Sequence, residues 1–422
     1  MTKGSVAPDY STRVVDRDLD ELLPALPAIA LEGPKGVGKT ATAQRRAHTV
    51  IRLDDPADAA LLDADPVLLA RSDPPVLLDE WQRMPTSWDL VRRAVDNGAS
   101  PGSFLLTGSA MPADASVHSG AGRIDSIRMR PMSLAERLPG IATISLAVLL
   151  AGGRPDIGGD SELTVADYRR EILTSGFPGI RRLEGRALRV RLDGYLRAIV
   201  QRDFPDQGLS VRRPETLLAW LRAYAAATST TSSFATIAAS ASGAAGTIPA
   251  KTTTIAYRDI LSQLWLLDPV EAWLPSGSAL SRLTKAPKHQ LADPALAARL
   301  LDLVDGDFVP GGRGAAMLGP LFEHLVALGV QTYAASAQAR VGHLRTKAGE
   351  HEVDLIIERE GAVVAVEVTL ARAIGDADVR HLRWLQEALG DRLVDAVVVT
   401  TGQRAYRRPD GIAVVPAALL GP

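Results

Sequence analysis

The chain has 422 residues, enough for two or three domains, and 46% of them are hydrophobic, which supplies a sizeable core. Its net charge is −2 with 23% charged residues, so no overall positive field directs it to nucleic acid or to an anionic membrane. Cysteine is absent, which excludes disulfides, thiol nucleophiles and cysteine-ligated zinc.

The N-terminus is polar and lacks the apolar segment of a signal peptide. The longest apolar run, residues 141–151, is too short to cross a bilayer. We therefore expect a soluble, cytoplasmic protein with no membrane partner.

A glycine-rich stretch at residues 31–40 fits the pattern G-x-x-x-x-G-K-[ST], between a strand candidate at 28–31 and a helix candidate at 41–47. Glycines allow such a loop to turn its N–H groups inward around a phosphate, and the following helix adds its positive dipole end. Lys39 would reach the β- and γ-phosphates, and Thr40 would ligate Mg²⁺. The strand–loop–helix order favours a nucleotide site over a chance glycine-rich turn. The residues predicted to bind the nucleotide are Gly33, Pro34, Lys35, Gly36, Val37, Gly38, Lys39, Thr40 and Ala41.

The segments on either side of this loop are less specific. The polar lead, residues 1–27, carries Tyr10 and Arg13, which are candidates to pack beside the nucleotide base. After the loop, residues 50–53 are predicted to form a second strand and residues 57–69 a helix.

Two carboxylates follow the next apolar strand, residues 76–78. Buried parallel strands are continuous apolar runs, and their carboxyl ends carry ligands. Asp79 is predicted to hold Mg²⁺, directly or through water, and Glu80 to orient and polarise the attacking water. The alternative is an ordinary strand end with two acids.

A further strand, residues 103–109, ends in hydroxyl side chains, and a fifth strand is predicted at 126–130. Between them, Arg123 is a candidate arginine finger or sensor, because a guanidinium near the γ-phosphate stabilises transition-state charge. A surface ion pair is the commoner fate of a single arginine.

These motifs, in this order, resemble a prokaryotic family of AAA-type ATPases that carry a C-terminal "domain of unknown function 4143". The resemblance implies an α/β fold with a P-loop AAA-type ATPase core, and ATP with Mg²⁺ as cofactors. It also implies that the fourth strand lies beside the P-loop strand and that Ser109 or Thr107 at its end contacts the γ-phosphate or the water. It does not imply a biological role. The motifs lie at residues 33–40, 78–82, 106–109, 121–123 and 131–134.

The middle of the chain continues the resemblance. Residues 175–179 resemble the G-G-F-P turn of that family, with Ser175 in place of the first glycine. The arginines that follow could contact nucleic acid, the phosphate of a neighbouring subunit, or carboxylates of the same chain. They are Arg181, Arg182, Arg186, Arg189, Arg191, Arg197 and Arg202.

Two predicted helices, 234–240 and 251–267, resemble a winged helix-turn-helix. Lys251, Thr252 and Thr253 could contact DNA from the start of the second helix, but winged helices also serve as packing modules. A following segment resembles a K-x-x-K-x-x-x-x-D pattern of the family, for which the sequence indicates no function. Its residues are Lys285, Lys288 and Asp293.

The C-terminal pattern resembles the restriction-endonuclease-like fold. There, a helix Glu, a strand Asp and an E-x-K on the next strand bind Mg²⁺ and activate water, and Glu323, Asp354 and Glu367 take the first three places. Thr369 takes the place of the lysine and has no charge to offer. We therefore expect a retained fold without nuclease activity. Nothing in the sequence requires Lys347 or Arg372 to act as substitutes.

We therefore predict a P-loop AAA-type ATPase domain at 1–135, a helical and winged-helix domain at 136–305, and a restriction-endonuclease-like α/β domain at 306–422. The expected function is ATP hydrolysis that drives a conformational switch, with DNA, a partner protein and a homo-oligomer as candidate partners. One alternative is an ATP-gated, metal-dependent nuclease. Another is a nucleotide-dependent DNA-binding regulator, such as a component of a toxin–antitoxin or phage-defence locus.

Overall fold

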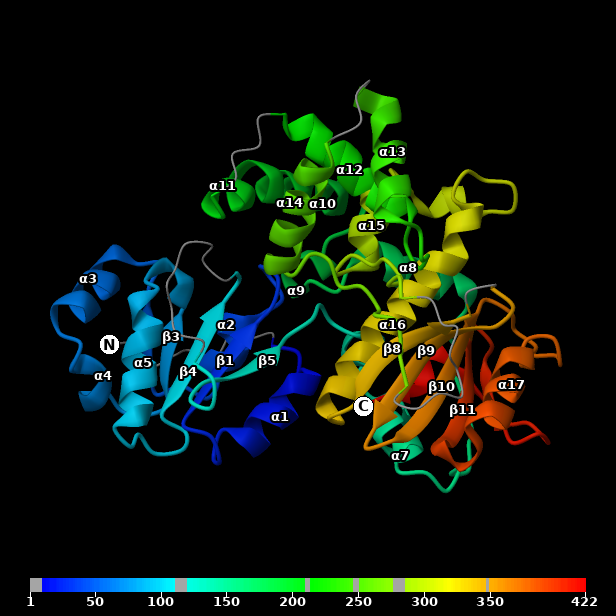
Figure 1. Ribbon diagram of the computed structural model, residues 1–422, viewed down its shortest axis with the longest axis horizontal. Helices are drawn as coiled ribbons and strands as arrows, with labels where there is room; N and C mark the ends of the chain where they lie inside the picture. Colours follow the sequence, from blue (N-terminus) through cyan, green and yellow to red (C-terminus); the bar gives the residue numbers. More distant parts are fainter. Residues whose placement is uncertain (1–9, 111–119, 209–212, 246–249, 276–284, 347–348) are drawn as a thin grey trace.

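The computed structural model describes residues 10–110, 120–208, 213–245, 250–275, 285–346 and 349–422. Figure 1 shows the N-terminal sheet on the left, a helical part above, and the C-terminal sheet on the right. Within the described residues, no helix combines the length and apolar character needed to span a bilayer.

The N-terminal part is a parallel sheet with the strand order β2-β3-β4-β1-β5. Helices cover both faces of β1, so both sets of its alternating side chains are apolar: Ala28 and Ala30 share one core with Trp88, and Ile29 and Leu31 belong to another. The order confirms the expected P-loop core, including a fourth strand beside the P-loop strand. The strands are β1 Ala28–Glu32, β2 Thr49–Arg52, β3 Val76–Asp79, β4 Phe104–Gly108 and β5 Asp125–Arg128. The helices are α1 Val14–Leu22, α2 Lys39–Gln44, α3 Pro56–Ala64, α4 Leu68–Arg71, η1 Trp81–Arg83, α5 Thr86–Asp96 and α6 Leu134–Arg137.

The prediction of one continuous helix at 57–69 is wrong, because this segment forms two helices, α3 and α4. Pro66 disfavours helical backbone at the residue before it, and Asp65 accordingly takes φ −132° and ψ 80°.

The middle part is helical. After its α14, the chain forms a two-stranded arm, residues 266–273 and 285–291, in which Val270 and Lys288 exchange backbone hydrogen bonds of 3.0 and 2.9 Å. The helix predicted at 251–267 is therefore too long, since its last residues belong to this arm. The helices are α8 Val165–Thr174, α9 Pro178–Arg181, α10 Gly185–Ala198, the π-helical turn η2 Ile199–Asp203, α11 Phe204–Asp206, α12 Pro214–Ala226, α13 Phe234–Ala245, α14 Lys251–Gln263 and α15 Pro294–Leu300.

The C-terminal part is a mixed sheet with the order β7-β12-β13-β11-β10-β9-β8. β8, β9 and β10 pair antiparallel, as the predicted hairpin requires, and β10, β11 and β13 pair parallel. The strands are β7 Gly159–Asp160, β8 Arg340–Arg345, β9 Glu352–Arg359, β10 Ala362–Thr369, β11 Leu393–Thr400, β12 Arg404–Arg407 and β13 Ala413–Pro416. The helices are η4 Asp305–Phe308, η5 Ala315–Met317, α16 Leu318–Ser336, α17 Arg380–Leu389, η6 Gly390–Arg392 and η7 Ala417–Leu419.

Part of the predicted middle domain pairs with the C-terminal part, β7 in the seven-stranded sheet and β6 in a separate two-stranded sheet. β6 Ile144–Ser145 pairs with β14 Leu420–Gly421, and β7 pairs with β12. α7 Leu146–Leu150 packs beneath β10 and β11. The domain boundaries, the winged helix and the restriction-endonuclease-like assignment stay predictions.

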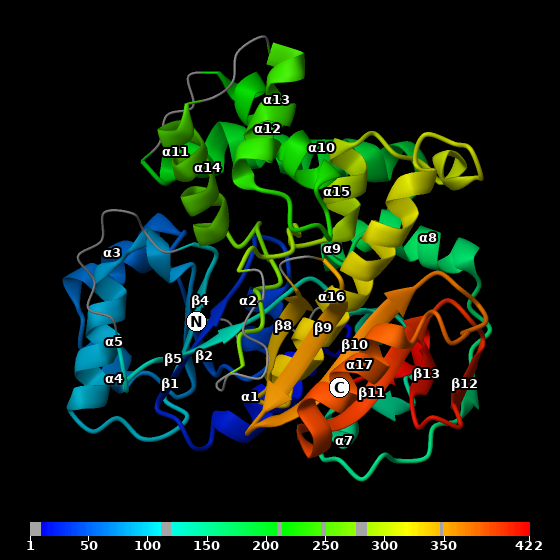
Figure 2. The ribbon, with the colours of Figure 1, turned by 45° about the vertical axis from the view of Figure 1, so that its right-hand side comes forward.

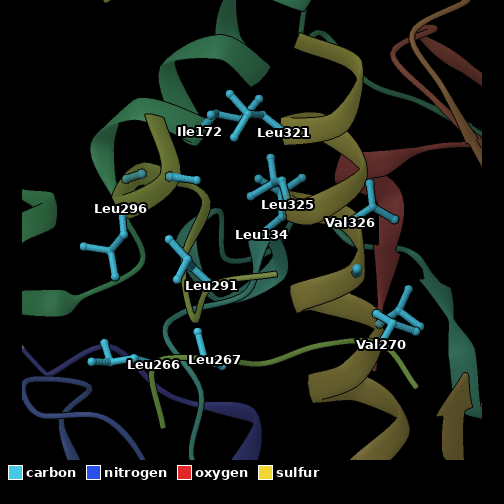
Figure 3. Close-up of a cluster of buried hydrophobic side chains, with 14 of the residues drawn as sticks. Leu134, Ile172, Leu266, Leu267, Val270, Leu291, Leu296, Leu321, Leu325 and Val326 are labelled. Carbon is cyan, nitrogen blue, oxygen red and sulfur yellow. The ribbon is translucent and has the colours of Figure 1, made fainter. Parts of the chain in front are cut away.

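The long helix α16 connects the parts of the molecule. It lies between α15 and the strands of the C-terminal sheet, as Figure 2 shows. Its Leu321 and Leu325 belong to one buried cluster with Leu134 of α6, Leu291 of the arm and Leu296 of α15 (Figure 3). Burying a leucine side chain contributes about 1.5–3 kcal/mol. The same helix therefore connects the P-loop part, the arm and the C-terminal sheet.

Candidate functional site

The phosphate-loop glycines take backbone conformations that a side chain would oppose. Gly33, Gly36 and Gly38 have φ of 150°, 82° and 103°. At Gly33 a Cβ would also lie 2.1 Å from the carbonyl oxygen of Met129, so no other residue fits there.

Lys39, the first residue of α2, is buried inside the loop. Its Nζ donates to the carbonyl oxygens of Gly33 at 2.7 Å and Pro34 at 3.0 Å. Burial lowers the pKa of Lys39 to about 8, although Glu80 and Asp79 oppose the shift.

The two halves of the predicted site meet at Asp79, where β3 ends. Thr40 Oγ1 donates to Asp79 Oδ1 at 2.7 Å, and the hydroxyl of Thr107 donates to the same oxygen. Thr107 is the register partner of Asp79 on β4. Hydroxyl and carboxylate oxygens are ligands that Mg²⁺ accepts, so Thr40 and Asp79 fit the predicted metal role.

Glu80 takes the left-handed conformation, with φ 56°. This conformation is uncommon for a residue with a Cβ and recurs at functional sites. Gln82 Nε2 donates to Glu80 Oε2, and Ser109 Oγ lies 3.4 Å from Glu80 Oε1. Glu80 and Ser109, which were both predicted as site residues, therefore lie together. It adds Gln82, which the sequence places two residues after Glu80 in a family motif.

Arg123 lies elsewhere. It precedes β5, at the opposite end of the sheet from the P-loop, because Asp125 pairs with Ile29 near the start of β1. Its Nε lies 2.8 Å from Asp96 Oδ1. This position does not support a finger in the site of the same chain, and a role toward a neighbouring subunit stays a prediction.

Residues of the middle part cover one side of the P-loop. Lys35 Nζ lies 2.5 Å from Asp203 Oδ1 in the π-helical turn, and Tyr195 donates to the Lys35 carbonyl oxygen at 3.1 Å. Arg83 pairs with Asp206 of α11 at 3.6 Å. These contacts line a small cleft that Gln82 and Ser109 share.

A larger pocket of about 730 Å³ lies on the other side of α2. Its lining includes Tyr10, Arg13, Ala41 and Thr42. The Tyr10 hydroxyl lies 2.9 Å from Thr42 Oγ1, and Arg13 Nη1 donates to the Val37 carbonyl oxygen at 2.7 Å. The polar lead therefore packs against the P-loop.

Asp293 has a structural position that the sequence did not indicate. It is fully buried, and its Oδ2 accepts from the backbone N–H of Gly176 at 2.6 Å and from Arg137 Nη2 at 3.4 Å. Its Oδ1 caps α15 through Ala295 at 2.8 Å. A Cβ on Gly176 would lie 2.5 Å from Arg137 Nη2, which explains the glycine in this turn.

Five of the seven arginines after this turn fall into two groups. Arg181 pairs with Glu171 at 2.7 Å, so one of them does contact an acid of the same chain. Four arginines of α10 are exposed, and no acid among the described residues forms an ion pair with them. They are Arg186, Arg189, Arg191 and Arg197.

The predicted nuclease-like carboxylates surround a lysine. Nζ of Lys288, a side chain only 1% exposed, lies 2.7 Å from Asp354 Oδ1, 2.9 Å from Glu323 Oε1 and 3.3 Å from Glu352 Oε1. Burial alone would lower the pKa of Lys288, but the carboxylates outweigh it and raise that pKa. Burial and the nearby Asp354 also raise the pKa of Glu367.

The two substitutes considered for the missing lysine do not fill this role. Arg372 is exposed, and Lys347 lies outside the described residues. Thr369 accepts a hydrogen bond from the backbone of Ala371 at 3.1 Å. Among the residues that the structure describes, no group of three or more Asp, Glu or His side chains is arranged to hold a metal ion. The cluster therefore does not fit the Mg²⁺ that the restriction-endonuclease-like resemblance implies.

Comparison with known families agrees with the order of the motifs. Residues 26–138 match an AAA domain, residues 165–307 match a domain of unknown function (DUF8612), and residues 318–420 match a domain of unknown function (DUF4143). The chain thus combines an AAA domain with a C-terminal DUF4143 domain, which confirms the expected family.

Two mycobacterial relatives match nearly the whole chain. They are the uncharacterized proteins Rv2008c of Mycobacterium tuberculosis and Mb2031c of Mycobacterium bovis, each 25% identical over 404 residues, with 93% of this chain and 80% of the relative covered.

Solved structures show weaker likenesses. The Walker-type ATPase PABY2304 of Pyrococcus abyssi has a TM-score of 0.39 at 16% identity, covering 70% of this chain and 99% of that one. The ORC2 protein of Aeropyrum pernix, in ADPNP–ADP complexes, has a TM-score of 0.32 at 17% identity, covering 72% and 96%.

Proposed function

We propose that the chain, with its AAA domain and C-terminal DUF4143 domain, binds ATP and Mg²⁺ at the P-loop and hydrolyses the ATP to drive a conformational switch. The observation that carries the proposal is the meeting of Thr40 and Asp79 at 2.7 Å, beside the buried ammonium of Lys39. The carboxyl ends of β1 and β3 meet there, which places the phosphate-binding and metal-binding side chains next to each other, as phosphoryl transfer requires.

Each residue has a separate task in this proposal. Lys39 would contact the β- and γ-phosphates, and Thr40 and Asp79 would hold Mg²⁺, which neutralises phosphate charge when it is bound. Glu80 would orient and polarise the attacking water, with Gln82 and Ser109 fixing its carboxylate.

The pocket of about 730 Å³ beside α2 is the proposed site of the base and ribose. Its volume falls in the range of small-molecule sites, and it adjoins Ala41 and Thr42 directly after the P-loop. Tyr10 supplies an aromatic side chain in this lining.

The proposed switch lies where the middle part covers the P-loop. Lys35–Asp203 and Arg83–Asp206 are ion pairs beside the end of the loop that would face the γ-phosphate. Phosphate charge would compete with the two aspartates for these cations, so ATP would weaken the contacts and loss of the γ-phosphate would restore them.

The direct test is calorimetry with ATP and Mg²⁺. Wild-type protein should bind, and Lys39→Ala should weaken binding by about tenfold to a hundredfold, because a charge-assisted contact to phosphate is lost. Lys251→Ala, which removes an exposed charge on α14, should bind as the wild type does. Absence of binding by the wild type would refute the proposal.

DNA is a second candidate partner, supported by the four exposed arginines of α10. If this surface contacts DNA, affinity should fall steeply with salt, because phosphate contacts release counterions. The variant Arg186→Ala/Arg189→Ala/Arg197→Ala should reduce both the affinity and the salt slope.

A control removes three exposed arginines from other elements: Arg71→Ala/Arg340→Ala/Arg380→Ala. The control should bind DNA as the wild type does. If the wild type stays unbound at low salt, with and without ATP, DNA is not a partner.

A further inference from the structure

The carboxylate cluster of the C-terminal part already holds a cation, and that cation belongs to the chain. We infer that the Lys288 ammonium replaces a divalent metal ion in this cluster, and that removing Lys288 opens the cluster to such an ion. The inference does not depend on the proposed ATPase function.

The contacts around Lys288 are those of a bound cation rather than of a surface lysine. Its Nζ lies within 3.3 Å of oxygens from Asp354, Glu323 and Glu352, and its side chain is only 1% exposed. Asp354 uses its second oxygen to accept from the backbone of Val368 at 2.9 Å, which fixes the carboxylate.

A second observation points to a vacant coordination direction at the same place. Oε1 of Glu367 is buried and has no hydrogen-bond partner among the described residues. An unpartnered carboxylate oxygen in low dielectric is costly, and its usual partners are a proton or a metal ion. One ammonium cannot satisfy all the oxygens gathered here.

The charged groups around Lys288 support the same inference. Asp354 and Lys288 are the pair in closest contact, and Glu352 also lies 3.7 Å from Arg345. The oxygens of Glu323, Glu352, Asp354 and Glu367 still outnumber the contacts that one ammonium can make. Removing Lys288 alone would leave Asp354 and Glu323 without their closest counter-charge, which is strongly unfavourable unless the carboxylates take up protons or a cation enters. A hard divalent ion with oxygen ligands is the class of ligand that would fit.

Lys288 reaches the carboxylate cluster from the arm. Lys288 pairs with Val270, and two residues earlier Asp268 binds Arg130 at 2.7 Å and Arg128 at 3.0 Å. Arg128 is the last residue of β5, and Arg130 follows it by two positions. β5 pairs with β1, the strand that precedes the P-loop. The arm is also held by the C-terminal sheet, because Ala272 pairs with His343 of β8. The lysine is thus positioned by an arm that the P-loop part and the C-terminal sheet both hold.

The experiment measures Mn²⁺ binding to nucleotide-free protein by electron paramagnetic resonance, together with the unfolding temperature with and without Mn²⁺. Lys288→Met should gain one Mn²⁺ per chain with at least about tenfold higher affinity than the wild type, and Mn²⁺ should raise its unfolding temperature. Lys288→Arg keeps a cation in place and should show no such gain.

The double variant Lys288→Met/Asp354→Asn is the control, because it removes a carboxylate together with the lysine. It should fold without Mn²⁺ and lack the added site. Because its P-loop is unchanged, any Mn²⁺ that it still binds measures binding at the P-loop. If Lys288→Met folds only when Mn²⁺ is present, the inference is supported. If it gains no Mn²⁺, or stays unfolded with Mn²⁺ while the double variant folds, the inference is wrong. It is equally wrong if the wild type binds the same Mn²⁺.

Discussion

Thr40 donates a hydrogen bond of 2.7 Å to Asp79, although the two residues are 39 positions apart in the chain. The contact joins the P-loop to the end of β3 and sets the oxygen atoms that would receive a metal ion beside Lys39. The proposed ATPase activity depends on that junction.

ATP binding should depend on pH through Lys39. Its pKa is about 8 in the free protein, and phosphate charge would raise it in the complex. The complex then binds more protons than the free protein, so affinity should fall as pH rises above about 8, and binding near that pH should take up protons.

Calorimetry in two buffers with different ionisation enthalpies measures this uptake. The buffer-dependent heat should appear near pH 8 and vanish near pH 6.5, where Lys39 is charged before binding. Equal heats in both buffers at every pH would contradict the assignment of Lys39.

Gln82 should act through Glu80 and not on nucleotide affinity. Gln82→Ala removes the amide that donates to the Glu80 carboxylate, so we expect turnover to fall by about tenfold with KM nearly unchanged. Steady-state phosphate release measures both parameters. A rise in KM at constant kcat would instead place Gln82 among the nucleotide contacts.

Asp293→Ala should destabilise the fold strongly. It would leave the fully buried Arg137 with only the more distant carboxylate of Glu171, at 3.8 Å, and the Gly176 amide without an acceptor, at a cost of about 3 kcal/mol. Denaturant unfolding measures the loss. Asp305→Ala removes an exposed partner of Arg169 and should change stability little, so equal effects of the two variants would contradict this explanation.

His324 should make the fold less stable in acid. Burial lowers its pKa to about 4, from an ordinary value near 6.5, so below pH 6.5 the unfolded chain binds the proton that the folded chain refuses. Its contribution to stability is complete above pH 6.5 and is lost as pH falls toward 4, by an amount on the order of 3 kcal/mol.

Glu323 and Glu367 act in the opposite direction, because burial raises the pKa of each. The test is therefore a difference: unfolding free energies of wild type and His324→Gln between pH 7 and pH 5. The variant should lose less stability over this interval. A parallel loss in both proteins would show that His324 does not titrate as described.

Local patterns made much of the nucleotide site predictable. The backbone conformation of a phosphate loop requires residues such as Gly33, Gly38 and Lys39, so the motif predicted them. The position directly after an apolar strand predicted Asp79 and Glu80. The hydrogen bond from Thr107 was not predictable in detail, because it depends on the register between β3 and β4.

The C-terminal cluster shows where such patterns fail. Glu323 and Asp354 followed from the order of helix and strands, but Lys288 lies 66 positions before Asp354 and reaches it only through the pairing of the arm. The sequence marks a threonine where a lysine is expected at 369. It does not indicate that a cation arrives from a different part of the fold. Similarly, the position of Arg123 depends on where β5 begins relative to β1.

The most direct test of the ATPase account is phosphate release with saturating ATP and Mg²⁺, comparing wild type with Glu80→Gln. The substitution keeps the size of the side chain and removes the carboxylate that polarises water. We predict that Glu80→Gln binds ATP as tightly as the wild type and hydrolyses it at least about a hundredfold more slowly. Hydrolysis by Glu80→Gln at the wild-type rate, in protein shown to be free of contaminating ATPase by the inactivity of Lys39→Ala, would contradict the account.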